Sequence, residues 1–340
     1  MADGPTRHRV TLIEGDGIGP EVTGATARIL EAAGAAIEWE RVLAGERAYA
    51  ETGNPLPDDV IESLQRNRVG LKGPLGTPKG TGFRSANVQL RQRLQLYVGW
   101  RPVASLPGIA TKYGDVDLVV LRENTEGLYA GIEHQVRGDT VVSLKLSSRA
   151  AATRIARWAF EFARNAGRQR ITVCHKKSVL PLGDGAFVDA FEEVGADYPF
   201  IEREQASVDQ VAMRLAQDPS AYDVLLLENL YGDILSDLCA GLVGGLGLVP
   251  GANVGDKVAL FEAVHGTAPD IAGKGIANPL AVLLSGVMLV EWMGQRAVGQ
   301  RVRAAVDRVL AEGRVRTGDL GGSANTEQFT DAIVAAMEHA

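Results

Sequence analysis

Several features are scarce in this 340-residue chain, and each scarcity excludes a class of protein. It has only two cysteines, Cys174 and Cys239, each within an apolar run, so a disulfide framework is excluded and reduced, buried thiols are predicted. The longest apolar runs, 238–250 and 280–293, fall short of the roughly 20 residues that span a bilayer. No apolar segment typical of a secretory signal opens the sequence. We therefore expect a cytoplasmic protein with no membrane partner.

Two long stretches of the chain each lack charged residues of one sign. No Asp or Glu occurs between Ser63 and Gly114, and no Lys, Arg or His occurs between Leu215 and Asp256. The first stretch holds nine basic residues, although the whole chain has a net charge of −7. They are Arg66, Arg68, Lys72, Lys79, Arg84, Arg91, Arg93, Arg101 and Lys112. The overall acidity argues against nucleic acid as a partner, which leaves a polyanionic small ligand or a basic subunit surface.

The acidic stretch contains two aspartates at helical spacing. Asp233 and Asp237 lie four residues apart, so in a helix both carboxylates project from one face. The neighbouring residues are largely apolar and supply no positive partner. The pair is either solvated near the start of a helix or ligates a hard divalent ion such as Mg²⁺ or Mn²⁺. A polycarboxylate with a metal ion would use both charged stretches. A metal–polyphosphate complex is disfavoured because no P-loop motif is present.

The pattern of apolar runs indicates an α/β protein. Short buried runs such as 9–13, 69–71, 118–121, 171–174 and 222–227 predict strands of a mostly parallel sheet. Amphipathic or apolar helices are predicted between them, and these include the following segments: 20–33, 149–166, 280–293 and 301–312. Composition marks no domain boundary.

Polar side chains follow several of the predicted strands, where active sites of parallel sheets gather. Tyr129 follows the segment 122–128, and Lys176 follows the strand 171–174. Either residue can transfer protons, although each taken alone could equally be structural. The segment 261–279 is rich in small residues that allow a ligand close to the backbone, but turn-rich loops share this composition.

Taken together, these segments resemble the β-decarboxylating dehydrogenases, which act on isocitrate, isopropylmalate and homoisocitrate. The most specific stretches are 122–133 (RENTEGLYAGIE), 229–237 (NLYGDILSD) and 265–278, and weaker matches run from residue 13 to 322. The resemblance implies a two-domain fold distinct from the Rossmann fold. A discontinuous large domain of residues 1–98 and 250–340 would bind the cofactor. A small domain of residues 99–249 would form the dimer, and the assembly could extend to a tetramer.

The resemblance assigns roles to individual residues, some of them acting in the neighbouring subunit's site. Tyr129 matches the proton donor and Lys176 the proton-relay lysine. The substrate's carboxylates would be bound by Ser85, Asn87, Arg91, Arg101 and Arg122. The metal ligands would be Asp233 and Asp237 of one protomer with Asp209 of the other. The cofactor would be bound by Lys72, Thr77, Glu262, His265, Gly266, Thr267, Ala268, Asp270, Ile271 and Asn278.

Two short segments favour one substrate and one cofactor within this family. Ser85 and Asn87 can hydrogen-bond a third carboxylate, which favours isocitrate over isopropylmalate, while homoisocitrate stays open. Asp270 and Ile271 stand where NADP-using relatives tend to carry Lys and Tyr, so NAD is expected. The resemblance thus predicts an enzyme that uses NAD and Mg²⁺ or Mn²⁺ to convert isocitrate, a tricarboxylate, to 2-oxoglutarate and CO₂.

The sequence departs from the family pattern at three positions. Lys177 and Ser178 follow Lys176 where the family usually has Ala and Asn, and Glu228 precedes the motif at 229–237 where a proline or small residue is usual. The rival from another functional class is a regulatory chain of a hetero-oligomeric isocitrate dehydrogenase. Such a chain is expected to have lost part of the catalytic set, which is complete here.

Overall fold

The computed structural model describes residues 7–77 and 85–338, and it divides them into two compact units. Unit 1 contains residues up to Leu94, Ser105–Thr111, and Gly244 onward. Unit 2 contains Gln95–Ala104 and Lys112–Val243. Two members of the basic stretch, Lys79 and Arg84, lie outside the described ranges. The cofactor and dimer roles expected of the two domains stay predictions.

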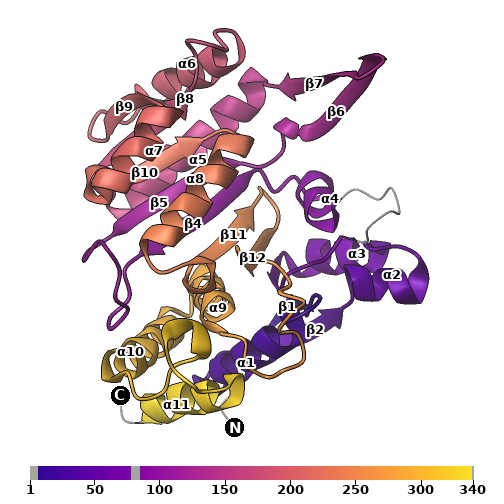
Figure 1. Cartoon of the computed structure of the whole chain (residues 1–340), viewed down its shortest axis with the longest axis vertical. Helices are drawn as coiled ribbons and strands as arrows, with labels where there is room; N and C mark the ends of the chain where they lie inside the picture. Colours follow the sequence, from indigo (N-terminus) through magenta and orange to yellow (C-terminus); the bar gives the residue numbers. More distant parts are fainter. Residues whose placement is uncertain (1–6, 78–84, 339–340) are drawn as a thin grey trace. The chain divides into compact units, whose positions relative to one another are not determined.

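Unit 1 is built on five strands in the order β2-β1-β3-β12-β11 (Figure 1). Only the pair β11–β12 is antiparallel. The strands are β1 (His8–Ile13), β2 (Ile37–Val42), β3 (Val69–Lys72), β11 (Pro250–Val254) and β12 (Ala259–Ala263). The helices are α1 (Gly19–Ala32), α2 (Glu46–Thr52), α3 (Asp58–Asn67), α4 (Ala86–Arg93), α9 (Leu280–Trp292), α10 (Arg296–Glu312) and α11 (Thr326–Glu338).

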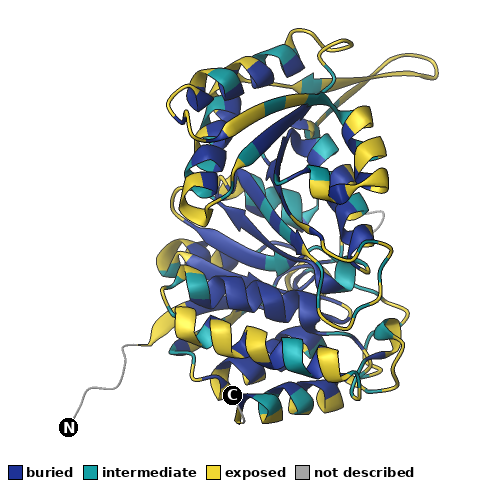
Figure 2. Ribbon diagram, turned by 90° about the vertical axis from the view of Figure 1, so that its left-hand side faces the viewer, coloured by how far each residue is buried: buried dark blue, intermediate teal, exposed yellow. Residues whose placement is uncertain are grey.

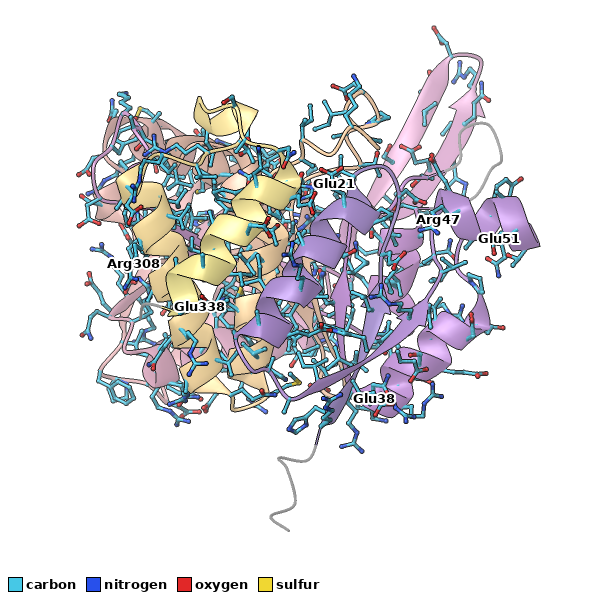
Figure 3. The ribbon with its side chains drawn as sticks, turned by 90° about the horizontal axis from the view of Figure 1, so that it is seen from below. Glu21, Glu38, Arg47, Glu51, Arg308 and Glu338 are labelled. Atoms are coloured by element: carbon cyan, nitrogen blue, oxygen red, sulfur yellow. The ribbon has the colours of Figure 1, made fainter. Side chains whose placement is uncertain are left out.

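The core of unit 1 centres on α9, whose residues are buried from Leu280 to Val290. This helix packs against β11 and β12 and contacts α1 and α10, so no polar face is needed. Figure 2 shows buried residues concentrated in the strands and in the helix faces turned toward them. Exposed charged side chains such as Glu38, Arg47 and Glu51 extend from the surface of the unit (Figure 3).

Unit 2 has strands in the order β4-β5-β10-β8-β9, with only the pair β4–β5 antiparallel. The strands are β4 (Val98–Ala104), β5 (Asp117–Glu123), β8 (Arg170–His175), β9 (Glu202–Ser207) and β10 (Val224–Leu227). The helices are α5 (Arg149–Ala166), α6 (Gly183–Gly195), α7 (Val208–Gln217) and α8 (Asn229–Leu242). A separate hairpin of β6 (Gly127–Arg137) and β7 (Thr140–Leu146) projects from unit 2 (Figure 1).

The predicted α/β class is confirmed, and the parallel strands of unit 2 place its polar residues at one edge. Arg122 lies near the end of β5, α8 begins after β10, and Lys176 follows β8. In the register of the sheet, Leu227 pairs with both Arg122 and Cys174, so these strand ends lie side by side. Among the described residues, no helix has the length and apolar character needed to cross a membrane.

Candidate active site

The two aspartates of α8 have positive partners that come from distant strands. Asp233 and Asp237 lie one turn apart, and their side chains are 35% and 55% exposed. Arg122, almost fully buried on β5, forms an ion pair with Asp233. Arg101 on β4 has its guanidinium nitrogens 3.7 Å from Asp233 Oδ1 and 3.9 Å from Asp237 Oδ1. Two arginines therefore balance two aspartates within unit 2.

The orientation of Arg122 is fixed by an amide at the start of α8. Its Nε and Nη2 donate to Asn229 Oδ1 at 3.0 and 2.6 Å. Asn229 in turn donates through Nδ2 to the carbonyl oxygen of Glu126 at 2.9 Å. Gly232 lies so close to Arg122 that an added Cβ would meet the arginine side chain at 2.6 Å. The motif at 229–237 thus supplies the two aspartates and also the residues that pack closely around Arg122.

Tyr129 lies at the start of β6 and completes this cluster. Its hydroxyl donates a hydrogen bond to Asp233 Oδ2, and the Arg122 guanidinium lies 4.9 Å from the centre of its ring. Burial raises the pKa of the Tyr129 phenol, and the Asp233 carboxylate raises it further. A phenol that stays protonated beside a carboxylate-binding arginine is suited to donate a proton to a bound substrate.

The chemistry of the α8 acids fits a hard divalent cation. Burial raises the pKa of Asp237, and the neighbouring Asp233 charge also acts in that direction against Arg101. Oxygen ligands are the ones that Mg²⁺ and Mn²⁺ prefer, and these ions commonly take only one or two protein carboxylates. Among the described residues, no group of three or more His, Cys, Asp or Glu is close enough to hold a metal ion.

Lys176 and Asp209, predicted to serve a neighbouring protomer's site, lie together at the ends of β8 and β9. Lys176 Nζ is 2.5 Å from Asp209 Oδ1 and donates to Ser207 Oγ at 3.3 Å. Hydrogen bonds from Lys176 and Ser207 lower the pKa of Asp209 to about 2. Next to them, Lys177 donates to Gln205 Oε1 at 2.9 Å. The pair Lys176–Asp209 is partly accessible, with side chains 33% and 61% exposed.

The remaining predicted arginine, Arg91, belongs to a buried charge cluster in unit 1. Its Nη2 lies 3.4 Å from Glu262 Oε1, and its Nε donates to Asn253 Oδ1 at 3.1 Å. Lys72, 2% exposed, has its Nζ 2.5 Å from Glu262 Oε2 and donates to the Gly73 carbonyl oxygen at 2.9 Å. Lys72 and Glu262, predicted to bind the cofactor, thus form a buried ion pair with each other.

The residues predicted to recognise a third carboxylate begin helix α4. Ser85 is the N-cap residue of α4 and makes no capping hydrogen bond with its side chain. Asn87 Oδ1 is buried and has no hydrogen-bond partner among the described residues. A buried acceptor without a partner is costly, so a ligand that donates a hydrogen bond at this helix start would satisfy it.

The loop 265–278 lines a cavity of about 640 Å³ within unit 1. Five of the predicted cofactor residues line it: His265, Gly266, Ala268, Ile271 and Asn278. Burial lowers the pKa of His265, whose Nε2 is buried without a hydrogen-bond partner among the described residues. Such a volume suits a nucleoside.

The other five predicted cofactor residues do not line this cavity, and two of them are Lys72 and Glu262 of the buried ion pair. The carbonyl oxygen of Thr267 accepts a hydrogen bond from the backbone N–H of Ile18 at 3.0 Å and so holds the loop. Asp270 and Thr77 are exposed.

Other cavity residues were given no role by the sequence. They are Ile18, Gly247, Ile276, Gly318, Asp319, Ser323 and Ala324. Asn278 Nδ2 donates to Asp319 Oδ2 at 2.9 Å, which joins the loop to the segment 317–322. That segment is the last part of the family resemblance, and its Gly-Asp-Leu-Gly-Gly sequence was the available signal.

A family model described as isocitrate/isopropylmalate dehydrogenase matches residues 9–333. The chain belongs to this family. It is 49% identical over 95% of its length to a catalytic chain of the mitochondrial NAD isocitrate dehydrogenase of Arabidopsis thaliana, covering 87% of that protein. It is 48% identical over 96% of its length to a regulatory chain of the mitochondrial NAD isocitrate dehydrogenase of Dictyostelium discoideum, covering 91% of it.

A solved structure shares the whole fold. The crystal structure of isocitrate dehydrogenase from Methylococcus capsulatus matches with a TM-score of 0.94 and 46% identity, over 97% of this chain and 99% of that one. The predicted resemblance and the predicted fold are therefore confirmed. The relatives include both catalytic and regulatory chains, so membership does not by itself assign activity.

The prediction of a cytoplasmic protein is wrong. The curated relatives of similar identity are named as mitochondrial NAD isocitrate dehydrogenase subunits, which points to the mitochondrion. Both cysteines are free and buried, as predicted. Reduced thiols indicate only a reducing compartment, and the lack of a secretory signal bears only on secretion. Neither observation distinguishes the cytoplasm from an organelle.

Proposed function

We propose that this chain is a catalytic isocitrate dehydrogenase that uses NAD and a divalent metal ion to form 2-oxoglutarate and CO₂. The observation that carries the proposal is the cluster of Tyr129, Arg122 and Asp233 with Asp237 one turn further along α8. It combines a protonated phenol, a carboxylate-binding guanidinium and two oxygen ligands for a metal. An oxidative decarboxylation of a hydroxy acid requires each of these three functions.

Substrate recognition is assigned to three arginines and one polar pair. Arg101 and Arg122 would bind the carboxylates nearest the metal, since guanidinium forks match carboxylate geometry. Arg91 would contribute a further guanidinium. Ser85 and Asn87 would bind the third carboxylate through two donors, the hydroxyl of Ser85 and Nδ2 of Asn87. An isopropyl group would leave this pair unsatisfied.

Metal binding is assigned to Asp233 and Asp237, with Asp209 supplied by a second copy of the chain. A bound Mg²⁺ or Mn²⁺ ion would place positive charge beside the substrate hydroxyl and the enolate oxygen. Lys176 is proposed to accept the hydroxyl proton and Tyr129 to donate a proton to the carbon that loses CO₂. We accordingly propose a homodimer with shared sites, or a tetramer made of two such dimers.

NAD is proposed to bind with its adenosine in the cavity lined by the loop 265–278. His265, whose lowered pKa keeps its ring neutral near pH 7, offers its unpartnered Nε2 to the ligand. The exposed Asp270 would accept ribose hydroxyls and repel a 2′-phosphate, which favours NAD over NADP. Lys274, close in sequence, would weaken that repulsion. The similar regulatory chain of Dictyostelium discoideum keeps a regulatory role for this protein as the alternative.

The test is NADH formation at 340 nm with Mn²⁺ present. D-isocitrate, homoisocitrate and 3-isopropylmalate are offered in parallel, each with NAD⁺ and with NADP⁺. Turnover of isocitrate with NAD⁺ is the expected result. A preference for homoisocitrate or 3-isopropylmalate would retain the chemistry but contradict the role of Ser85 and Asn87. Absence of turnover with all three would favour the regulatory alternative.

A further inference from the structure

A partly buried lysine and two buried carboxylates lie in unit 2 outside the residues assigned above. Lys145 near the end of β7 forms ion pairs with both Asp184 and Glu228. Its side chain is 18% exposed, and those of the two acids are 1% and 9% exposed. Burial acts to lower the pKa of Lys145, but hydrogen bonds to the two carboxylates raise it overall, so the ammonium stays charged. Three separate elements therefore meet at one lysine.

Asp184 connects this cluster to Lys176, the proposed proton-relay lysine. Asp184, in the first turn of α6, accepts a hydrogen bond at 2.6 Å from the backbone N–H of Lys176 through Oδ2. The other oxygen of the same carboxylate pairs with Lys145. Asp184 is buried and cannot exchange these partners for water. The position of the backbone at Lys176 therefore depends on the position of Lys145.

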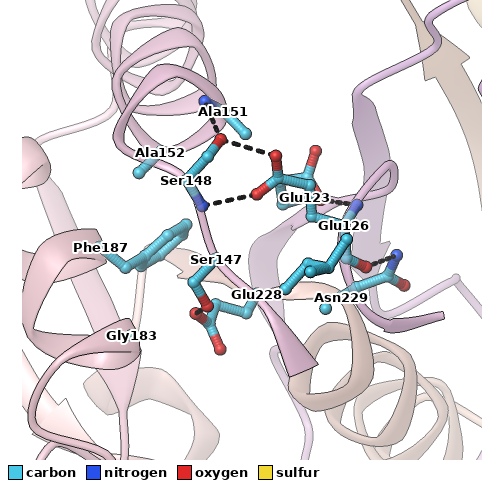
Figure 4. Close-up of a pocket in the computed structure, with 12 residues that line it drawn as sticks. Glu123, Glu126, Ser147, Ser148, Ala151, Ala152, Gly183, Phe187, Glu228 and Asn229 are labelled. Carbon is cyan, nitrogen blue, oxygen red and sulfur yellow. Dashed lines mark hydrogen bonds between the residues drawn. The ribbon is translucent and has the colours of Figure 1, made fainter. Parts of the chain in front are cut away.

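Glu228 connects the cluster to α8, the helix that carries the aspartates proposed to bind the metal. Glu228 is the N-cap residue of α8, and its carbonyl oxygen accepts the first helical hydrogen bond, from Gly232 N at 2.8 Å. Its side chain pairs with Lys145 and lies 3.4 Å from Ser147 Oγ, beside a cavity of about 20 Å³ (Figure 4). A carboxylate at a helix N-terminus also complements the helix dipole. Glu228 thereby ties the start of α8 to Lys145.

We propose that Lys145 is a positioning residue that, by holding Asp184 and Glu228 together, fixes the backbone at Lys176 and the first turn of α8. Lys145 touches none of the reacting groups, so it acts through these two carboxylates. This inference rests on the proposed function, which assigns proton relay to Lys176 and metal binding to α8. It also gives a role to Glu228, one of the three departures from the family pattern.

The same unit contains a matched control at the opposite edge of its sheet. Arg168 precedes β8 and bridges Asp117 and Asp223 at 2.5 and 3.0 Å, with a side chain 21% exposed. Both acids lie at the amino ends of strands, away from the carboxyl ends that carry the proposed site. Replacing Arg168 or Lys145 by Met therefore removes a basic residue of similar exposure that bridges two carboxylates. The acids of the control, Asp117 and Asp223, are 64% and 19% exposed and so more open than Asp184 and Glu228.

The experiment compares Lys145→Met, Lys145→Arg, Glu228→Gln and Arg168→Met in the full chain with isocitrate, NAD⁺ and Mn²⁺. Misplacement of reacting groups by about 1 Å lowers rates by about 100-fold, so we expect Lys145→Met to lower kcat by roughly 10- to 100-fold. Its KM for isocitrate should change by less than about threefold, because Lys145 contacts no proposed substrate ligand. Lys145→Arg should restore most of kcat, and Glu228→Gln should have an intermediate effect. Arg168→Met should keep kcat within about twofold.

A second measurement follows the backbone amides directly by hydrogen exchange. Exchange at Lys176 and Gly232 should quicken in Lys145→Met and Glu228→Gln and stay unchanged in Arg168→Met, because the cluster protects only the first two sites. If the unmodified chain does not oxidise isocitrate, the proposed function fails and exchange alone decides the positioning role. Should Lys145→Met not fold, Glu228→Gln provides the same two readouts.

Three results would overturn the positioning role. The first is equal loss of kcat in Lys145→Met and Arg168→Met, which would indicate general destabilisation. The second is recovery of activity on raising the protein concentration, since Lys145 would then act on assembly and not on the positions of Lys176 and α8. The third is unchanged exchange at Lys176 and Gly232.

Discussion

The buried cluster around Glu262 allows a quantitative test of the electrostatics of unit 1. Burial by itself would raise the pKa of this carboxyl, but Lys72, Arg91 and Asn253 outweigh it and lower the pKa to about 2. We consider the substitution Glu262→Gln, which keeps the size of the side chain and removes its charge. Lys72, 2% exposed, then loses its carboxylate partner.

The magnitude follows from the pKa of Glu262. The depression from 4.5 to about 2 is worth about 3 kcal/mol of folding free energy at neutral pH, at about 1.4 kcal/mol per pKa unit. Because the native pKa is depressed, this contribution is complete above about pH 4.5 and disappears as the pH falls toward 2. At pH 3 only about 1 kcal/mol should remain.

The assay is denaturant unfolding of the unmodified chain and of Glu262→Gln at pH 7 and pH 3. The difference in the free energy of unfolding should be about 3 kcal/mol at pH 7 and shrink to about 1 kcal/mol at pH 3. Glu38→Gln is the control, because Glu38 and its partner Arg9 are both more than half exposed and should contribute less than about 1 kcal/mol. A difference for Glu262→Gln that is independent of pH would refute the reasoning.

Three further predictions concern the proposed site. Tyr129→Phe keeps the ring beside Arg122 but removes the hydroxyl that would donate the proton. Steady-state kinetics should therefore show kcat lowered by about 100-fold or more, with little change in the isocitrate KM. An unchanged kcat would exclude Tyr129 as the donor. Asp233→Asn should weaken Mn²⁺ binding by at least about tenfold in a metal titration, and unaltered binding would place the metal elsewhere. Asp270→Lys combined with Ile271→Tyr should move the ratio of kcat/KM values toward NADP by at least about tenfold, whereas an unmoved ratio would show that the ribose is bound elsewhere.

Local patterns predicted the elements well because their causes are local. The apolar period over 149–166 predicted a helix, and α5 spans those residues. The predicted helix at 301–312 is longer in the structure, since α10 begins at Arg296 in a stretch with no apolar period. The four-residue spacing of Asp233 and Asp237 likewise predicted one helix face.

The partners of those elements could not be predicted from local patterns. Arg122 and Asp233 are 111 positions apart, and Lys145 and Glu228 are 83 apart, so neither pair leaves a periodic signal. Lys72, which the family resemblance predicts to bind the cofactor, pairs with Glu262, 190 positions further along the chain. Such contacts depend on which strand ends become neighbours, which only the register of the sheet determines.

The charge pattern that the sequence first displayed has a consistent explanation in the folded chain. A stretch without acids supplies Arg101, a stretch without bases supplies Asp233 and Asp237, and the fold brings them into contact with Arg122. Two guanidinium groups opposite two carboxylates leave unit 2 nearly neutral at this point. Under the proposed function, a tricarboxylate bound with a divalent cation would add charges of both signs. The arginines would then pair with the substrate while the aspartates pair with the metal, and every charge would stay paired, as a half-buried group of four charges requires.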